Sequence, residues 1–164
     1  MLLLIFVLYS INSQAHTTMI TPPYLQKGDT IAIVATARKH IVKSLQPTID
    51  LIESWGLHVV FGKSIGLEEN QLAGSDEQRA ADLQEQLDNP NIKAIWCARG
   101  GYGTVRIIDM IDFSKFKKHP KWVMGFSDVT VLHSHINTLD VATLHSIMPF
   151  TVPKAPEEVK QTFK

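Results

Sequence analysis

Ser127 is the residue of this sequence with the clearest capacity for covalent chemistry. It lies in Gly125-Phe126-Ser127-Asp128, at a predicted junction between a strand and a helix. A tight turn there lifts a serine hydroxyl above the sheet edge, and the following N–H can stabilise an oxyanion. The general form of this nucleophile elbow has glycine two residues after the serine, where this chain has Val129. The alternative interpretation is that Ser127 or Asp128 caps the next helix.

A glycine turn, Gly100-Gly101-Tyr102-Gly103, is the second candidate site. Backbone N–H groups in such a turn can approach a phosphate or a developing oxyanion. The turn matches neither G-x-G-x-x-G nor the Walker A pattern, so a tight turn into the next helix is the competing interpretation. Arg99 and Arg106 flank it and can pair with a substrate carboxylate, although arginines in such places commonly serve solvent or local ion pairs.

The seven histidines and the single cysteine do not have the spacing of a metal site. No H-E-x-x-H occurs, and His133 and His135, two residues apart, point in different directions on a helix. We therefore expect no metal and no cofactor. His145 falls at a predicted strand end, where a structural histidine is the simpler interpretation. Cys97 lies in a strand-like run and is expected to be a small buried residue rather than a nucleophile.

Strands and helices that alternate along the chain must position these residues. Apolar runs predict strands at residues 30–35, 57–61, 92–98, 121–125 and 142–144. Helical spacing predicts helices at 44–55, 75–87, 104–111 and 129–139, the second opened by a capping box of Ser75 and Gln78. We expect an α/β fold, Rossmann-like or flavodoxin-like, with a parallel sheet and flanking helices. Ligands of such sheets bind beyond the carboxyl ends of the strands, where Ser127 and the glycine turn fall.

Composition excludes several classes of protein. The chain has 164 residues, and 16 Lys and Arg balance 16 Asp and Glu, which argues against nucleic-acid binding. A hydrophobic share of 45% is that of an ordinary globular protein. The lone Cys97 cannot form an internal disulfide and favours a reducing compartment. The basic stretch at residues 115–121 is expected to be a solvated turn.

The N-terminal residues 1–18 are interpreted separately. Residues 1–11 are almost wholly apolar, and Ser13-Gln14-Ala15 follows at the spacing of a signal-peptidase site. No Lys or Arg precedes Lys27, and the apolar run is too short for a membrane span. The segment is therefore either an export signal, which would place the protein in the periplasm, or sequence translated upstream of a true start at Met19.

In order along the chain, these segments resemble the N-terminal half of the LD-carboxypeptidase family. That family consists of serine peptidases and includes muramoyltetrapeptide carboxypeptidases and microcin C immunity proteins. The resemblance extends from Pro22 to about Met148. Its motifs are PPYLxxGDTI at 22–31, ESWGL at 53–57, LAGSDEQRAADL at 72–83, AIWCARGGYG at 94–103 and GFSD at 125–128.

The resemblance implies a role for particular residues. Ser127 would be the nucleophile, and the N–H of Asp128 with one from Gly100 or Gly101 would form the oxyanion hole. The reaction would be hydrolysis, through an acyl-enzyme, of the bond between the L-centre of a diamino acid and the terminal D-Ala of a murein tetrapeptide. The family's setting implies cytoplasmic cell-wall recycling by a homodimer.

Arg99, just before the glycine turn, and Tyr102, within it, are the candidate substrate-binding residues. A nucleophilic serine also needs a base and a carboxylate that orients it. The family supplies Glu and His from a C-terminal domain, so we expect residues 19–150 to be the nucleophile domain. Residues 151–164 would then begin a linker to a missing C-terminal domain, and the isolated chain would have negligible activity.

Three other hypotheses stay open at this point. The chain can be a non-catalytic module that binds a peptide or forms dimers. It can instead belong to a hydrolase of aminoacyl-nucleotide antibiotics. The third is a self-sufficient hydrolase whose base is His133, His135 or His145.

Overall fold

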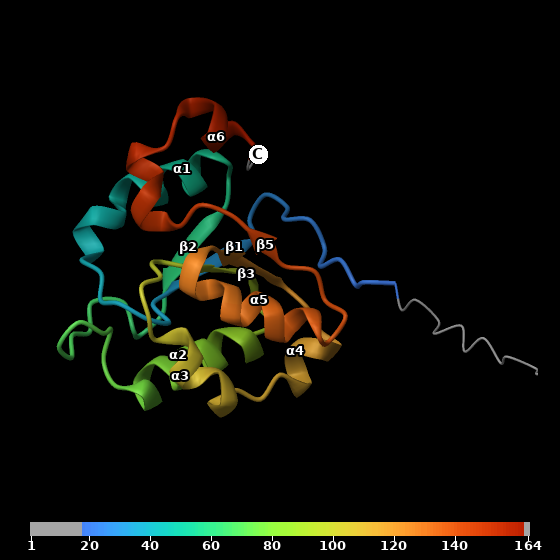
Figure 1. The fold of residues 1–164 in the computed structure, drawn as a ribbon. Coiled ribbons are helices and arrows are strands. Elements are labelled where there is room, and N and C mark those ends of the chain that lie inside the picture. Colours follow the sequence, from blue (N-terminus) through green and yellow to red (C-terminus); the bar gives the residue numbers. More distant parts are fainter. Residues whose placement is uncertain (1–17, 163–164) are drawn as a thin grey trace, which may run out of the picture.

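The computed structural model describes residues 18–162, so residues 1–17, on which the interpretation of a leader rests, lie outside the described part. Within it, a parallel sheet has the strand order β2-β1-β3-β4-β5 (Figure 1). The strands are β1 (Thr30–Val34), β2 (His58–Phe61), β3 (Ile92–Cys97), β4 (Trp122–Gly125) and β5 (Leu144–His145). The predicted α/β fold is confirmed, and this is the flavodoxin-like order. Its reversal between β1 and β3 marks the edge where ligands bind in such sheets.

Helices cover both faces of the sheet. They are α1 (Gln46–Ser54), α2 (Asp76–Asp88), α3 (Thr104–Ile107), α4 (Ser114–Lys118), α5 (Thr130–Asn137) and α6 (Glu157–Gln161). The 3-10 turns are η1 (Val42–Leu45), η2 (Ile108–Met110), η3 (Ser127–Val129) and η4 (Pro149–Lys154). Figure 1 shows α1 on one face and α2 to α5 on the other. No helix within residues 18–162 has both the length and the apolar character needed to cross a membrane.

Several predicted helices are shorter than their apolar spacing indicated. The predicted helix at 44–55 begins as a 3-10 turn, and α1 starts at Gln46 with Pro47 in its first turn, where proline costs no hydrogen bond. The helix predicted at 104–111 ends as α3 at Ile107 and continues as η2. The helix predicted at 129–139 is preceded by η3, which is the tighter form common at helix ends.

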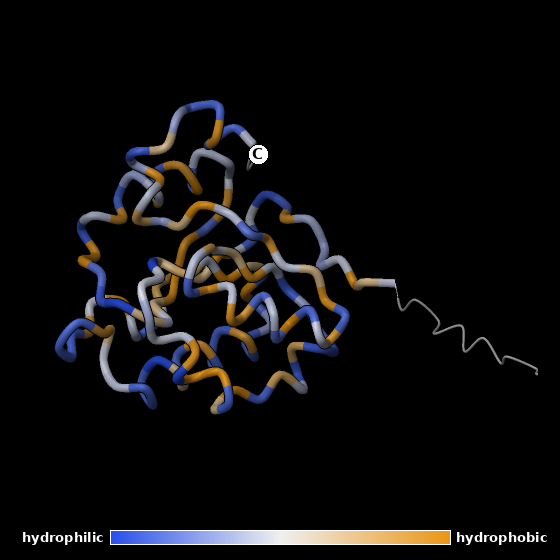
Figure 2. Tube along the Cα trace, viewed as in Figure 1, coloured by the Kyte–Doolittle hydropathy of each residue, from blue (hydrophilic) through white to orange (hydrophobic). Residues whose placement is uncertain are grey.

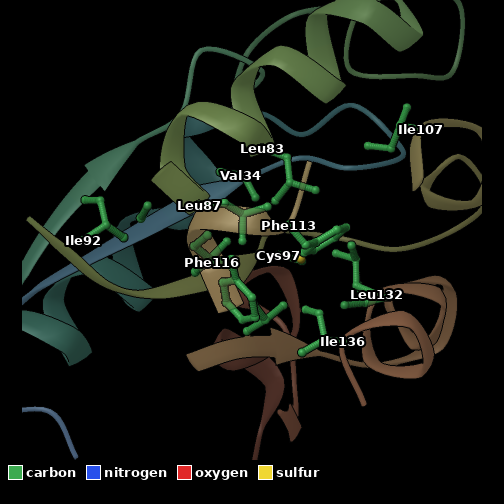
Figure 3. Close-up of a cluster of buried hydrophobic side chains, with 14 of the residues drawn as sticks. Val34, Leu83, Leu87, Ile92, Cys97, Ile107, Phe113, Phe116, Leu132 and Ile136 are labelled. Carbon is green, nitrogen blue, oxygen red and sulfur yellow. The ribbon is translucent and has the colours of Figure 1, made fainter. Parts of the chain in front are cut away.

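Apolar side chains pack in two clusters, one on each face of the sheet. β1 is buried on both faces, which explains its continuous apolar sequence TIAIV. The cluster beneath α2, α4 and α5 includes Leu83, Phe116 and Leu132 (Figure 3). The cluster beneath α1 includes Ile52 and Trp96. Figure 2 shows the hydrophobic residues along the central strands and hydrophilic ones on the outer turns.

The prediction that residues 115–121 form a solvated turn is wrong. Residues 114–118 form α4, whose Phe116 is fully buried. Lys121 is also buried, and its ammonium group donates to the carbonyl oxygens of Gln86 (3.0 Å) and Asn89 (2.6 Å). The last carbonyls of a helix have no partner within it, so Lys121 caps the C-terminus of α2. Burial lowers the pKa of Lys121 to about 8.

Candidate active site

Ser127 follows β4 directly in a backbone conformation that side chains rarely adopt. Its φ is +59°, in the left-handed region, and the residue is exposed to solvent. Strain of this kind concentrates at functional positions and is a property of the nucleophile elbow. Gly125 has a φ of +152°, and a Cβ there would lie 3.0 Å from the methyl groups of Val129. The predicted tight turn is therefore present, with Val129 packed against its first glycine.

The structure does not support the alternative interpretation that Ser127 caps a helix. Neither η3 nor α5 has a side-chain cap, and within residues 18–162 the Ser127 hydroxyl has no hydrogen-bond partner. Asp128 instead reaches a different element. Its Oδ2 accepts from the backbone N–H (3.0 Å) and the hydroxyl (2.7 Å) of Thr104, at the start of α3. The hydroxyl at the elbow is thus left available, while the neighbouring carboxylate holds two loops together.

The glycine turn lies against the elbow. A Cβ at Gly100 would lie 3.3 Å from both the backbone nitrogen and the Cβ of Asp128. The two predicted sources of oxyanion-binding N–H groups are therefore neighbours, although they are far apart in the sequence. Gly101 has a φ of +119°, and a Cβ there would lie 2.7 Å from Cδ of Arg38. Glycine is required at this position for both conformation and space.

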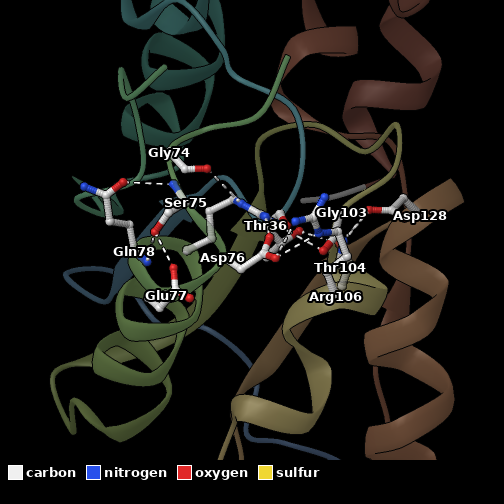
Figure 4. A network of polar contacts seen from close by, with 11 residues as sticks. Thr36, Gly74, Ser75, Asp76, Glu77, Gln78, Gly103, Thr104, Arg106 and Asp128 are labelled. Carbon is white, nitrogen blue, oxygen red and sulfur yellow. Dashed lines mark hydrogen bonds and ion pairs between the residues drawn. The ribbon is translucent and has the colours of Figure 1, made fainter. Parts of the chain in front are cut away.

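A buried polar network supports the two turns (Figure 4). The hydroxyls of Thr36 and Thr104 lie 2.9 Å apart and are fully buried. Nη1 of Arg79 donates to the carbonyls of Thr36 (2.7 Å) and Gly103 (3.1 Å), and Nη2 pairs with Asp76. Arg79 is itself 1% exposed. The network joins the loop after β1, the glycine turn and the first turn of α2.

The arginines and the tyrosine of the glycine turn have different surroundings. Arg106 donates from Nε (2.8 Å) and Nη2 (2.6 Å) to Oδ2 of Asp76, which raises the Arg106 pKa. Arg99 is partly buried, with its guanidinium carbon 5.3 Å from the ring centroid of Phe150. Tyr102 is 55% exposed and has a φ of +151°. Of the two predicted carboxylate-binding arginines, Arg106 is thus already engaged by a carboxylate of the chain.

The histidines near β4 have partners other than the serine hydroxyl. His133 is buried, its Nε2 lies 3.0 Å from the carbonyl oxygen of Gly125, and burial lowers its pKa. The ring of His145 lies 5.9 Å from that of His133, and the ring of His135 packs 4.6 Å from that of Phe113. Within residues 18–162 none of these histidines hydrogen-bonds to Ser127.

Cys97 is not available as a nucleophile at this edge. The Cys97 thiol is completely buried, and burial raises its pKa to about 12, so the group stays protonated. The prediction of a small buried residue is confirmed. In the part of the chain that the structure describes, no three His, Cys, Asp or Glu side chains lie close enough to hold a metal ion.

Sequence analysis missed Thr104, Arg79 and Arg38 at this site. One signal for Arg79 was available, because it lies four residues before Leu83 and therefore on the buried face of α2. A cation on an apolar helix face requires buried partners. Thr104 and Arg38 carried no such signal, since their contacts come from segments distant in the sequence.

Comparison with known proteins places this chain in a family. A family model described as the LD-carboxypeptidase N-terminal domain matches residues 31–146. A probable murein peptide carboxypeptidase of Bacillus subtilis is 43% identical over 129 residues, which are 77% of this chain and 40% of that protein.

Solved structures share the fold. The muramoyltetrapeptide carboxypeptidase of Oxalobacter formigenes has a TM-score of 0.72 at 27% identity, covering 82% of this chain and 46% of that one. The microcin C7 self-immunity protein MccF, known from Escherichia coli, has a TM-score of 0.80 at 23% identity, covering 88% and 44%. The chain spans less than half the length of each of these three proteins. Since the family model matches well over half of its residues, this chain belongs to the LD-carboxypeptidase family.

Proposed function

We propose that this chain carries the nucleophile of a serine LD-carboxypeptidase that removes the terminal D-Ala from murein tetrapeptides. The observation that carries the proposal is the contact between the elbow and the glycine turn. Ser127 stands exposed in a left-handed conformation, and Gly100 lies against the backbone nitrogen of Asp128. The names of the relatives, which include murein peptide and muramoyltetrapeptide carboxypeptidases, support the substrate class.

The proposed reaction proceeds through an ester on Ser127. Oγ attacks the carbonyl carbon of the scissile amide, and the negative charge on the carbonyl oxygen is stabilised by the N–H groups of Asp128 and of Gly100 or Gly101. The C–N bond then breaks, and D-Ala leaves with a proton on its amine. Water hydrolyses the acyl-enzyme and restores the hydroxyl.

The proton of the Ser127 hydroxyl needs a base during the attack. Within residues 18–162 no histidine or carboxylate hydrogen-bonds to Oγ, so the decisive experiment supplies the half of a relative that this chain does not match. In a chimera, this chain replaces the matching segment of the Bacillus subtilis protein. The chimera is incubated with murein tetrapeptide, and released D-Ala is quantified.

We expect the chimera to release D-Ala and Ser127→Ala to lower kcat by about three orders of magnitude or more. Ser114→Ala, which removes an exposed hydroxyl from α4, is the matched control and should leave the rate unchanged. Unchanged release by the Ser127→Ala chimera would refute the proposal. Peptide binding without acylation of Ser127 would instead identify a binding module, and turnover of an aminoacyl nucleotide alone would identify the microcin-type hydrolase.

We also propose that the protein works as a homodimer in the cytoplasm, in cell-wall recycling. Light scattering during size-exclusion chromatography measures the first property, and fractionation of cells measures the second. A start at Met19 in the purified protein would support the cytoplasm. A start within the first 18 residues at a signal-peptidase site would support export.

A further inference from the structure

We propose that Arg38 and Arg99 form a binding site for the free carboxylate of the substrate's terminal residue, beside the Gly100-Gly101 turn. The proposal rests on the proposed function for the kind of ligand, a peptide with a free C-terminus. It adds the groups that would make the enzyme a carboxypeptidase rather than an enzyme that cleaves within peptides. A separate readout, the binding of acid and amide forms of one peptide, tests it.

Covalent geometry restricts where such a site can lie. In the terminal residue, only the amide nitrogen and one Cα separate the carboxylate carbon from the scissile carbonyl carbon. A group that binds this carboxylate must therefore lie next to the groups that bind the carbonyl oxygen. In this chain those groups are placed at Asp128 and the glycine turn, so the adjoining side chains are the candidates.

Arg38 lies directly on the glycine turn. A Cβ at Gly101 would lie 2.7 Å from Cδ and 2.9 Å from Nε of Arg38. The guanidinium group of Arg38 therefore packs against Gly101. The backbone at Arg38 is anchored, because it forms a bridge with Leu72 and the next residue, Lys39, donates its N–H to Gln71 (3.1 Å). The side chain is exposed, and no carboxylate within residues 18–162 pairs with it.

Arg99 immediately precedes Gly100 in the chain. Its guanidinium carbon is 5.3 Å from the centre of the Phe150 ring, and the N–H of Phe150 donates to Ala98 (3.3 Å). Stacking on a ring orients the planar guanidinium while its N–H groups stay available for a carboxylate. In the described part of the chain no carboxylate pairs with Arg99 either.

The other cations near this edge are already engaged or neutral. Arg106 pairs with Asp76, and Lys39 pairs with Glu68. Burial and the charge of Arg99 lower the pKa of His40, so this imidazole stays neutral near pH 7. Arg38 and Arg99 are therefore the two guanidinium groups beside the glycine turn that have no acidic partner in the described residues. A bidentate carboxylate matches that chemistry.

The test compares two peptides that differ only at the C-terminus. The 164-residue chain, carrying Ser127→Ala so that the peptides stay intact, is titrated with murein tetrapeptide and with the same peptide ending in a carboxamide. Isothermal calorimetry gives both values of Kd. We expect the peptide with the free carboxylate to bind at least about tenfold more tightly than the carboxamide. The ratio of the two Kd values should fall as the salt concentration rises.

Arg38→Gln and Arg99→Gln should each bring the ratio of the two Kd values close to one, while weakening binding of the amide much less. Arg106→Gln is the matched control, because it removes an arginine of α3, just after the same turn, that is already paired. Near-UV circular dichroism confirms that each variant is folded. An unchanged ratio in Arg38→Gln or in Arg99→Gln would overturn the proposal. An equal loss in Arg106→Gln, or no binding of the peptide acid by the Ser127→Ala chain, would also overturn it.

These outcomes are distinct from a failure of the proposed function. If the acid is preferred but Ser127 in the chimera is never acylated, the carboxylate site stands and the nucleophile assignment falls. If the chimera releases D-Ala but the acid and the amide bind equally well, the nucleophile stands and the carboxylate site falls.

Discussion

At the scale of single residues, Thr104 connects the two turns of the candidate site. Its N–H and hydroxyl both donate to Asp128, and its hydroxyl also lies 2.9 Å from that of Thr36. Both threonine hydroxyls are buried. A buried polar group that loses its hydrogen-bond partner is desolvated without compensation, which is unfavourable. Single substitutions at Thr104 should therefore lower stability.

Thr104→Val keeps the shape of the side chain and removes the hydroxyl. We expect it to lower the free energy of unfolding by about 1–3 kcal/mol, because Asp128 and Thr36 each lose a partner. Urea denaturation of the chain measures this value. Thr104→Ser, which retains the hydroxyl, should recover most of the loss. Equal stability of Thr104→Val and the wild type would show that the contact carries no net energy.

Lys121 provides a prediction about pH. Its pKa is about 8 in the folded chain against 10.5 for an ordinary lysine, so the unfolded state binds its proton more tightly. The unfolded state therefore carries more protons between these two values, and the free energy of unfolding should rise as pH increases from 8 towards 10.5. Below pH 8 the full penalty of burying the charged ammonium is present.

The measurement compares wild type with Lys121→Met in denaturant titrations between pH 7 and pH 10. The wild type should gain stability relative to Lys121→Met over this range. Lys117→Met, which removes an exposed lysine from α4, serves as the control. A constant difference between wild type and Lys121→Met at every pH would contradict the assignment.

At the scale of elements, α2 is held along its whole length. Ser75 and Gln78 form the predicted capping box at its start, and Lys121 caps its end. In its middle, buried Asp82 accepts from the backbone N–H groups of Lys63 and Ser64, both at 2.9 Å. These contacts fix α2 against the loop after β2. They also fix the side from which Arg79 reaches the glycine turn.

Removal of the cap should therefore weaken α2. Ser75→Ala removes the acceptor of the Gln78 N–H, and we expect a loss of about 1 kcal/mol in the free energy of unfolding. Ser114→Ala, at a helix start without a side-chain cap, should change stability by less than about 0.5 kcal/mol. Thermal or urea unfolding separates the two. Equal effects of the two variants would show that the capping box contributes nothing specific.

At the scale of the whole molecule, one sheet separates two apolar clusters that share its strands. The three tryptophans all pack on the α1 side, while Leu83 lies in the cluster on the opposite side. The α1 side also has a groove of about 650 Å³, whose lining includes Trp55, Trp122 and Met124. β1 and β3 are buried on both faces, so both clusters pack on the same strands. Loss of packing in one cluster should therefore also lower the stability of the other.

Leu83→Ala tests this coupling. The side chain is fully buried, so we expect a loss of about 2–5 kcal/mol in the free energy of unfolding. Tryptophan fluorescence, which reports the opposite face, should shift to the same lower midpoint as circular dichroism. Val105→Ala, at a 48% exposed position, is the control. Separate midpoints for the two signals would show that the two faces unfold independently.

Much of the fold and the tight turn at Ser127 could be predicted because both depend on local spacing. The alternation of apolar runs with helical periods predicts a parallel α/β sheet, and the Ser75–Gln78 capping box lies at the start of α2. Gly125 and Ser127 have the spacing of an elbow, and both adopt positive φ. These features involve residues within a few positions of one another, so the sequence by itself determined them.

Only the tertiary structure decided which charged groups are engaged. Arg106 pairs with Asp76, 30 positions away, and Arg38 reaches Gly101 from the loop after β1. Lys121 is buried because the carbonyls at the end of α2 lie beside it, although it ends a lysine-rich stretch of the sequence. The physical reason is the same in each case. Whether a charged side chain is solvated or paired depends on segments that come into contact only when the sheet has formed. Local spacing in the sequence does not predict those contacts.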